Sequence, residues 1–258
     1  MDILEKIVEH KKDEVKGLKG RGISLPPEGF FEKRGFRDAL LKARPMGIIA
    51  EVKKASPSKG LLCPDFDPES LCKEYQQGGA DCISVLTDER FFQGRLQYLF
   101  RVKRTCSLPV LRKDFIIDHI QVEEAEAWGA DAILLICAIL DASLLKELLA
   151  HATELGMDCL VEVHDEGEAE KAIISGADLI GINNRNLKDF SVSLETSIRV
   201  RAMIPKGIPV VSESGIRDEK DMKVLASSGI QAALIGESLV RASNRPEKIR
   251  QLKGFKRD

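Results

Sequence analysis

The residues Gly47–Gly60, GIIAEVKKASPSKG, contain the start of the predicted core and the loop that opens from it. The apolar run Ile48–Ala50 predicts a buried strand, and the Ser, Pro and Gly residues at the end predict a loop. Glu51 and Lys53 fall where this strand ends. Burying either charge alone would be costly, so the pair indicates the mouth of a site. The loop offers hydroxyls, backbone N–H groups and a lysine, which suit a phosphate. A surface charge pair followed by an ordinary turn is the alternative that this stretch alone leaves open.

From Gly47 onward, short apolar segments alternate eight times with helical patterns. The segments are rich in β-branched residues or leucine, as expected for parallel strands that are buried on both faces. We predict these strands at residues 48–53, 82–87, 109–113, 132–137, 159–163, 179–183, 209–213 and 232–236. Helices are predicted to begin between them at Asp67-Pro68, Asp118, Asp165 and Asp218, and the last near Pro246.

A weak internal repeat favours a closed barrel. Gly79-Ala80-Asp81, Gly129-Ala130-Asp131 and Gly176-Ala177-Asp178 each end a helix and start a strand, about 50 residues apart. Gly229 does the same before the last strand. The fold class predicted is α/β, a (β/α)8 TIM barrel with an N-terminal helical extension, for which about 250 residues is typical. The chain has neither G-x-G-x-x-G nor a Walker A pattern, which argues against an open nucleotide-binding sheet.

The segment before the first strand predicts two helices. An apolar stripe among charged residues indicates a helix over residues 2–19, and a shorter helix is predicted at Phe36–Lys42. This segment is too short for an independent domain. We therefore expect residues 1–46 to form an extension that covers the mouth of the barrel as a lid or plug, and residues 47–258 to form one catalytic barrel domain. Four lysines of the first helix are expected to form a solvated face: Lys11, Lys12, Lys16 and Lys19.

The composition argues against several classes of partner. The formal net charge is −2 with acids and bases interspersed, which suits neither a nucleic-acid nor a membrane surface. No apolar run approaches the length of a membrane span. Without a coiled-coil seam or a large apolar stripe, a monomer is the default expectation.

The cysteines and histidines predict neither disulfides nor a metal site. The six cysteines show no CxxC spacing and suit free, buried thiols in a reducing cytoplasm. The four histidines form no HExxH or paired pattern, so no metal or other cofactor is expected. His164 follows a predicted strand, and we expect it to lie at the surface or to support a neighbour rather than to catalyse.

Polar residues gather at the carboxyl ends of the predicted strands, where active sites of such barrels lie. The set is Glu51, Lys53, Lys113, Glu162, Asn183, Arg185, Glu213, Ser214 and Gly236. Each member has a structural alternative, such as a carboxylate paired with a distant arginine, a solvated lysine, or an asparagine in a turn. Their convergence at one mouth instead predicts acid–base catalysis by lysines and carboxylates.

The last two strand–helix junctions, Ser212–Ile216 and Ile235–Leu239, indicate a phosphate site. Their glycines let backbone N–H groups approach an anion, and the loops after strands seven and eight usually bind phosphate in this fold. With Ser56 across the mouth, a small phosphorylated substrate is the expected ligand.

Seven ordered motifs resemble those of indole-3-glycerol phosphate synthases. They are EVKKASPSKG, LTDERFFQG, LRKDFIID, LVEVHDE, IGINNRNL, SESGI and IGESL, and the likeness runs from the N-terminal ILEKIVEHKKDEV to about Arg241. The resemblance implies a carboxy-lyase of tryptophan biosynthesis. Such an enzyme closes the pyrrole ring of 1-(2-carboxyphenylamino)-1-deoxyribulose 5-phosphate and releases carbon dioxide, water and indole-3-glycerol phosphate.

The same resemblance implies roles for the catalytic residues. Lys113 in LRKDF would be the general acid on the ketone oxygen, and Glu162 in LVEVH would be the base or the partner of the developing positive charge. Lys53 and Glu51 would bind the substrate carboxylate and assist dehydration. The remaining polar residues would orient hydroxyls and complete the ring: Asn183, Arg185, Glu213 and Ser214.

Two further groups of binding residues follow from the resemblance. The phosphate would be held by Ser56, Gly215, Gly236, Glu237 and Ser238. The aromatic ring would lie against a wall formed by Phe92, Phe115 and Leu134.

Two alternative interpretations stay open. Phosphoribosylanthranilate isomerase, another phosphosugar barrel, resembles the chain at the phosphate loops, but the Cys and Asp expected for its acid–base pair are not at the strand ends. A non-catalytic phosphate-binding barrel would retain the phosphate loops and lose the polar ring, which is complete here. The sequence does not decide which lysine serves which step.

Overall fold

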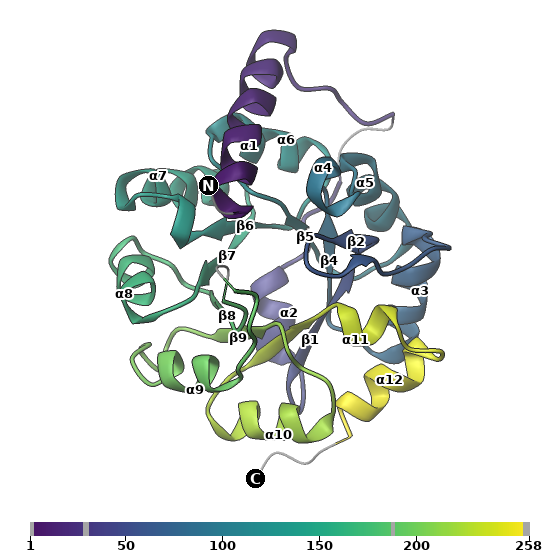
Figure 1. Ribbon diagram of the computed structural model, residues 1–258. Helices are drawn as coiled ribbons and strands as arrows, with labels where there is room; N and C mark the ends of the chain where they lie inside the picture. The colour runs from purple at the N-terminus through teal and green to yellow at the C-terminus, as the bar shows by residue number, and fades with distance from the viewer. Residues whose placement is uncertain (1–2, 28–30, 187–188, 255–258) are drawn as a thin grey trace.

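Eight parallel strands close into a barrel surrounded by helices, so the predicted α/β fold, a (β/α)8 barrel, is confirmed (Figure 1). The computed structural model describes residues 3–27, 31–186 and 189–254. The strands are β1 (Gly47–Val52), β4 (Cys82–Leu86), β5 (Val110–Lys113), β6 (Ala132–Ile136), β7 (Asp158–Val163), β8 (Ile180–Asn183), β9 (Val210–Glu213) and β10 (Ala232–Ile235). Each agrees with its predicted segment to within one residue at either end. β10 pairs in parallel with β1 and closes the barrel.

The helices lie outside the barrel, five of them with starts within one residue of the predicted ones. They are α3 (Pro68–Gly78), α4 (Glu89–Phe92), α5 (Leu96–Thr105), α6 (His119–Ala127), α7 (Ala142–Glu154), α8 (Glu166–Ile174), α9 (Glu195–Arg201), α10 (Glu219–Ser227), α11 (Glu237–Val240) and α12 (Arg245–Leu252). A short 3-10 turn, η1 (Cys137–Ile139), follows β6. The predicted N-cap aspartates each accept a hydrogen bond from a first-turn N–H: Asp67, Asp118, Asp165 and Asp218. None of the described helices is long and apolar enough to cross a membrane.

The internal repeat has a physical cause at the base of the barrel. The glycines that end the helices have φ values of 89°, 88°, 95° and 79°, at Gly79, Gly129, Gly176 and Gly229. Just after the first of these, the Asp81 carboxylate accepts the Ile48 N–H at 2.7 Å, and after the second the Asp131 carboxylate accepts the Val110 N–H at 2.8 Å. In these two repeats the acid therefore satisfies an N–H group at the start of a neighbouring strand, that of the second residue of β1 and that of the first residue of β5.

The strand side chains form two apolar layers. Ile49, Leu111 and Leu160 belong to a cluster inside the barrel, whereas Ile48 and Ile133 belong to the larger cluster between strands and helices. Both layers are fully buried, which explains why the strands read as continuous apolar runs rather than alternating ones.

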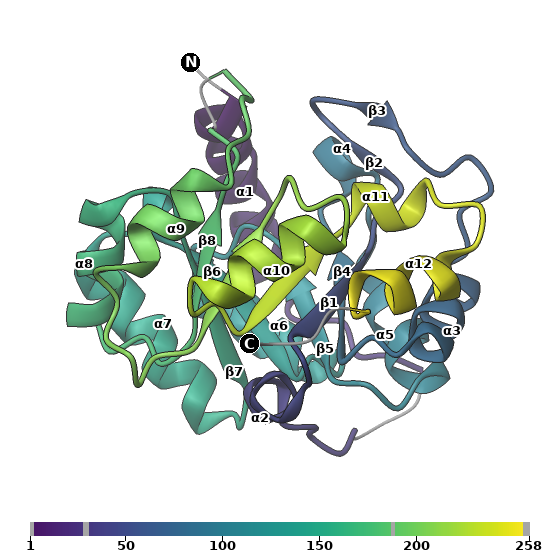
Figure 2. The ribbon, with the colours of Figure 1, turned by 90° about the horizontal axis from the view of Figure 1, so that it is seen from below.

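The loop after β1 contains a short antiparallel hairpin that the sequence did not indicate. Its strands are β2 (Ala55–Ser56) and β3 (Gly60–Leu61), with Ala55 opposite Leu61. Gly60 has φ 65°, a conformation that glycine adopts without strain, so the turn can reverse tightly here. In Figure 2 this hairpin stands at the upper edge of the molecule, on the side of the strands' carboxyl ends.

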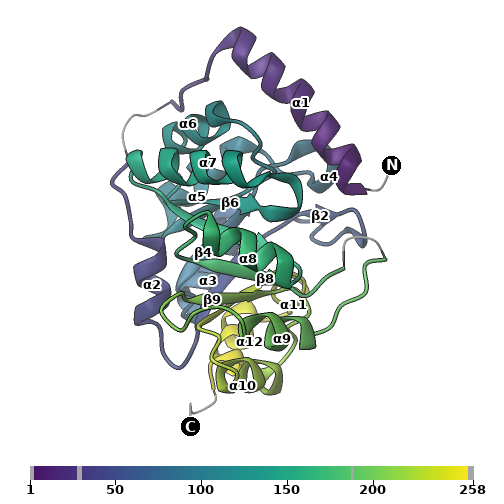
Figure 3. The ribbon, with the colours of Figure 1, turned by 90° about the vertical axis from the view of Figure 1, so that its left-hand side faces the viewer.

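The N-terminal segment forms two helices that lie at opposite ends of the barrel: α1 (Ile3–Arg21) and α2 (Phe36–Lys42). Figure 3 shows α2 at the left, while the N-terminal end of α1 reaches the right, near β2. Phe36 and Leu40 pack into the cluster inside the barrel, and the Arg37 N–H donates to Asp158 at the start of β7 at 3.0 Å. The expectation that both helices cover the mouth is therefore wrong for α2, because its apolar side chains fit the open base of the barrel.

A second expectation fails within α1. Lys11 is not part of a solvated face, since its side chain is only 2% exposed and meets acidic residues from distant loops. Lys12, Lys16 and Lys19 are exposed, as predicted.

Candidate active site

A cavity of about 680 Å³ opens at the carboxyl ends of the strands. Every residue predicted for the site lines it, from β1 round to α11. Ile3, Leu4 and Ile7 of α1, which were not among the predicted site residues, also line it. The strand ends thus supply a polar floor, and the N-terminal helix supplies part of an apolar rim.

Lys113, Glu162 and Asn183 form the centre of the polar floor. Lys113 Nζ lies 3.1 Å from Glu162 Oε2 and 3.7 Å from Glu213 Oε2. The Asn183 amide donates to Glu162 Oε1 at 3.2 Å. These groups stand at the ends of four adjacent or near-adjacent strands, and both carboxylates are almost fully buried.

The buried charges set each other's protonation. Burial alone would lower the pKa of Lys113, but Glu162, Glu213 and Glu51 outweigh it and hold that pKa above its usual value. Burial would raise the pKa of Glu162, yet Lys113 and then His164 bring it below its usual value. Burial, together with the neighbouring Glu162, raises the pKa of Glu213 to about 8. Near neutral pH the centre therefore holds a charged lysine, an ionised Glu162 and a protonated Glu213.

A second ion pair lies beside this centre. Lys53 Nζ contacts the carboxylate of Glu51 at the end of β1. A Cβ atom on Gly236 would overlap Glu51 Oε2 and crowd Lys53 Nζ. Gly236, predicted as a phosphate ligand, thus also provides the space in which this pair lies. In the same way, a Cβ on Gly181 would overlap Glu213 Oε1.

The loops after β9 and β10 form the other side of the cavity, facing Ser56 of β2. Ser214 and Gly215 have φ values of 69° and 85°, so the chain turns sharply and presents consecutive N–H groups. The Ser238 hydroxyl donates to the Ile216 carbonyl at 3.0 Å, which ties the two loops together. Three basic side chains that were not assigned to the site also line the cavity: Lys59, Arg217 and Arg241. Lys59 and Arg217 lie in the loops after β1 and β9, which was the signal that could have identified them, whereas Arg241 is the C-cap residue of α11.

The carboxylate of Glu237 pairs with Arg241 at 3.2 Å, so its backbone N–H rather than its side chain suits an anion. Arg185 donates through its guanidinium to the Phe190 carbonyl at 3.3 Å, and its backbone N–H donates to Asn183 Oδ1 at 3.0 Å. Arg185 therefore holds the loop after β8 and orients Asn183.

Phe92 and Phe115 lie side by side on the apolar wall, with ring centroids 5.9 Å apart. Leu134, in the middle of β6, also lines the cavity. The wall and the polar floor line the same cavity, which suits a ligand with both aromatic and polar groups.

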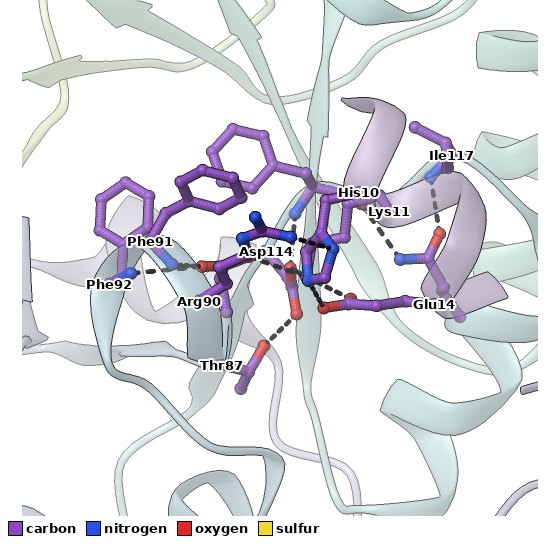
Figure 4. A network of polar contacts seen from close by, with 12 residues as sticks. His10, Lys11, Glu14, Thr87, Arg90, Phe91, Phe92, Asp114 and Ile117 are labelled. Atoms are coloured by element: carbon purple, nitrogen blue, oxygen red, sulfur yellow. Dashed lines mark hydrogen bonds and ion pairs between the residues drawn. The ribbon is translucent and has the colours of Figure 1, made fainter. Parts of the chain in front are cut away.

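Lys11 joins α1 to this wall. Its Nζ lies 3.0 Å from Asp88 Oδ2 and 2.8 Å from Asp114 Oδ1. Asp88 caps α4 by accepting the N–H groups of Phe91 and Phe92, while Asp114 accepts that of Phe115. Figure 4 shows Lys11 and Asp114 at the centre of this network, with Phe91 and Phe92 beside it.

The protonation of Asp114 follows from the same contacts. Burial would raise its pKa, but the charges of Lys11 and Arg112 outweigh burial and bring it far below the usual range. Sequence reasoning missed Lys11, Asp88 and Asp114, because their contacts join positions far apart in the chain. No group of three or more His, Cys, Asp or Glu residues within the described ranges is placed to hold a metal ion.

Solved structures of low sequence identity share the barrel. An N-acetylmannosamine-6-phosphate 2-epimerase from Clostridium perfringens aligns with a TM-score of 0.61 at 17% identity, over 86% of this chain and 96% of that one. A thiamine phosphate pyrophosphorylase from Pyrococcus furiosus gives 0.60 at 17% identity, over 81% of this chain and 94% of the other. Likeness at this level shows the fold alone.

Sequence comparisons identify the family. The family model described as indole-3-glycerol phosphate synthase matches residues 4–252. A protein of that name from Desulfotalea psychrophila is 56% identical over 256 residues, which cover 97% of this chain and 98% of that protein. Another, from Bacillus velezensis, is 49% identical over 254 residues, covering 98% and 100%. With these matches over nearly its whole length, the chain belongs to the indole-3-glycerol phosphate synthase family.

Proposed function

We propose that the cavity converts 1-(2-carboxyphenylamino)-1-deoxyribulose 5-phosphate into indole-3-glycerol phosphate by acid–base catalysis between Lys113 and Glu162. Membership of the family supplies the reaction, that of a carboxy-lyase in tryptophan biosynthesis. The observation that carries the assignment of roles is the buried pair itself. The Lys113 ammonium lies 3.1 Å from the Glu162 carboxylate, in a cavity that an aromatic wall and the glycine-rich loops also line.

Ring closure places opposite charges on two parts of the substrate. The aromatic carbon that bears the carboxylate bonds to the ketone carbon, so negative charge develops on the ketone oxygen and positive charge on the ring nitrogen. Lys113 donates its proton to that oxygen, and the Glu162 carboxylate stabilises the positive nitrogen. Both groups are in place before the reaction, and they act in a buried site where their charges interact strongly.

The second ion pair serves the remaining steps. Lys53 binds the substrate carboxylate and, with Glu51, assists the loss of the hydroxyl group as water after carbon dioxide has left. Glu213 and Ser214 complete the ring of polar groups around the reacting atoms. Support comes from the lining of the cavity, where Lys53 and Lys113 face the same space from different strands.

Binding at the two ends of the substrate positions the flexible chain between them. The phosphate is held by Ser56, the backbone of Gly215, Gly236 and Glu237, and Ser238, while the aromatic ring lies on Phe92, Phe115 and Leu134. Asn183 orients the hydroxyls with the help of Arg185. Such remote contacts supply binding energy that holds the reacting carbons close together.

The N-terminal extension, residues 1–46, acts as a partial lid on the catalytic barrel formed by residues 47–258. Ile3, Leu4 and Ile7 line the cavity, so α1 excludes water from its apolar side. The protein acts as a monomer in the cytoplasm. In support, its exposed large apolar residues come from separate elements, and its six cysteines are free thiols, which suit a reducing compartment.

The test is the appearance of indole fluorescence when the purified protein is mixed with the carboxyphenylamino-deoxyribulose phosphate. We expect turnover in the wild type and at least a hundredfold loss in Lys113→Ala, with substrate affinity changed only about two- to threefold. Lys206→Ala, in an exposed loop, is the matched control and should behave as the wild type. Substrate binding without product would favour the non-catalytic barrel, and a loss of tenfold or less in Lys113→Ala would remove Lys113 from the general-acid role.

A further inference from the structure

His164 lies between two carboxylates at the edge of the reaction centre. It follows Glu162 by two residues at the end of β7, and its Nε2 lies 3.4 Å from Glu162 Oε1. On the other side of the ring, Nδ1 lies 3.0 Å from Glu168 Oε2. The side chain is 14% exposed, so the ring is held within the protein rather than in solvent.

Glu168 fixes the orientation of this ring. The same oxygen that meets Nδ1 also accepts the backbone N–H of His164 at 2.8 Å. Glu168 lies in the first turn of α8, where its own N–H donates to the cap residue Asp165 at 2.9 Å. The Glu168 side chain therefore points toward His164.

The opposite edge of the ring faces Glu162. Within the described residues, His164 Nε2 is buried and has no hydrogen-bond partner, so the Glu162 oxygen at 3.4 Å is the acceptor it faces. Among the described residues, the polar neighbours of Glu162 include Lys113 on Oε2, the Asn183 amide and His164 on Oε1, and the carboxyl group of Glu213. Of these, Lys113 and His164 can carry a positive charge.

We propose that His164 is a positioning residue that holds the Glu162 carboxylate ionised and in place, and that Glu168 keeps the imidazole ring protonated and turned toward it. This inference rests on the proposed role of Glu162 at the reaction centre. Its chemical reason lies in the acid step. When Lys113 gives its proton to the ketone oxygen it loses its charge, and Glu162 loses its nearest cation while positive charge is forming on the substrate. A protonated His164 supplies the cation that remains.

The surroundings of His164 favour this protonated state. Burial would lower its pKa, but Glu168, Glu162 and, from β9, Glu213 outweigh burial and raise that pKa above its usual value. Lys113 of β5 faces the far side of Glu162 and is the other charged group of the cluster. His164 in turn contributes to the lowered pKa of Glu162.

Two substitutions of His164 separate its contacts. Gln reaches about as far as Nε2 and retains a neutral donor toward Glu162, whereas Asn mimics Nδ1 and retains only the contact with Glu168. Glu168→Gln keeps the side-chain shape but removes the charge that favours the protonated ring. His119→Gln is the control, since His119 is 42% exposed and pairs with Glu147, which does not line the cavity.

The experiment measures kcat and KM for these variants from about pH 3.5 to pH 9, a range that reaches below the usual pKa of a glutamate, with the carboxyphenylamino substrate and indole fluorescence. We expect His164→Gln to lower kcat roughly tenfold at pH 7 while KM stays within about threefold. His164→Gln removes a positive neighbour and so raises the pKa of Glu162. The acid limb of the pH profile, where kcat falls as Glu162 becomes protonated, should therefore move to higher pH by about half a unit to one unit. Glu168→Gln should shift the limb in the same direction by less, and His164→Asn should be at least as impaired as His164→Gln.

An unchanged acid limb in His164→Gln would overturn the proposal, as would full activity in His164→Asn, which would make the Glu168 contact a purely structural one. A change in KM without a change in kcat would also contradict it. The failure of the proposed function is distinguishable, because Glu162→Gln would then itself retain turnover. If Glu162→Gln is inactive and His164→Gln matches the wild type, only this inference fails.

Discussion

Glu162 and Glu213 are two buried carboxyl groups on neighbouring sides of Lys113, and their environments push their protonation in opposite directions. At Glu162, burial would raise the pKa, but Lys113 and His164 lower it below its usual value. The carboxyl group of Glu162 is therefore ionised near neutral pH. At Glu213 burial is reinforced by the charge of Glu162, and its pKa rises to about 8. A pair of titratable groups separated in this way is typical of acid–base sites.

Replacing each carboxyl by its neutral isostere should therefore have unequal effects. Glu162→Gln removes a charge and should lower kcat about a hundredfold or more at pH 7, whereas Glu213→Gln imitates the protonated state and should lower it less than about tenfold. Steady-state kinetics on both variants make the comparison. Equal losses would mean that Glu213 acts in its ionised form.

The raised pKa of Glu213 also has a consequence for stability. Between roughly pH 4.5 and pH 8, the folded protein keeps a proton that an unfolded glutamate has released, so this group makes stability fall as pH rises. The Tm of Glu213→Gln relative to the wild type should therefore increase from pH 5 to pH 8. Thermal unfolding at both pH values tests the sign, and a constant difference in Tm would contradict it.

Gly236 leaves room for the ion pair between Glu51 and Lys53, because it has no side chain. Because a Cβ would overlap Glu51 Oε2 and crowd Lys53 Nζ, Gly236→Ala should displace this ion pair and lower kcat about tenfold or more. Gly207→Ala is the control, since no atom lies within 4 Å of its added Cβ and the residue is exposed. Equal activity of the two variants would show that the strand end can shift without harm to catalysis.

At the scale of elements, α1 is attached to the barrel by a buried charge. Lys11 contacts Asp88 and Asp114, and both carboxylates also accept N–H groups of the segments that carry Phe92 and Phe115. The position of the lid helix and the shape of the aromatic wall therefore depend on the same side chain. A buried ion pair is more specific than an apolar contact, and it therefore fixes the position of α1 along the barrel.

Lys11→Met should uncouple α1 from the aromatic wall. It leaves Asp88 and Asp114 buried with fewer partners, which costs about 3–5 kcal/mol of the free energy of unfolding for such pairs. KM should rise at least about tenfold because the wall loses its support. Lys12→Met, one position along and exposed in a pair with Glu9, should change stability by less than about 1 kcal/mol.

Thermal unfolding and steady-state kinetics on the two variants decide the matter. A lower Tm with an unchanged KM would make Lys11 a structural anchor with no influence on the wall.

Over the whole molecule, the features that could be predicted from the sequence were those set by local pattern. The eight apolar runs located the strands, and the aspartate caps located helix starts, because both depend on neighbouring residues. Chain order then placed Glu51, Lys113, Glu162 and Glu213 at one end of the barrel and so around one cavity.

What could not be predicted depends on contacts between distant parts of the chain. The charged pattern of α1 made Lys11 look solvated, since nothing near it in sequence shows that Asp88 and Asp114 will cover it. The place of α2 was missed for the same reason. Phe36 and Leu40 form too short an apolar stripe to show which end of the barrel they fill.

The two ends of the barrel should therefore respond differently to truncation. Removing residues 1–21 takes away α1, with Ile3, Leu4 and Ile7 of the cavity rim, but leaves the interior of the barrel closed at its base. This variant should remain folded and show a raised KM. Removing residues 1–45 also takes away Phe36 and Leu40, exposes the apolar interior at the base, and should cost about 3–5 kcal/mol for each large buried side chain.

Circular dichroism and steady-state kinetics on the two truncations separate these roles. We expect cooperative unfolding with weak substrate binding for the shorter deletion, and a protein that is unfolded or aggregated for the longer one. A double substitution, Phe36→Ala with Leu40→Ala in the full chain, should lower Tm while leaving KM near the wild-type value, because α2 lies at the end of the barrel away from the cavity. If that double variant raised KM as strongly as the loss of α1, the base and the mouth would be coupled through the barrel interior, and the separation of lid and plug would be wrong.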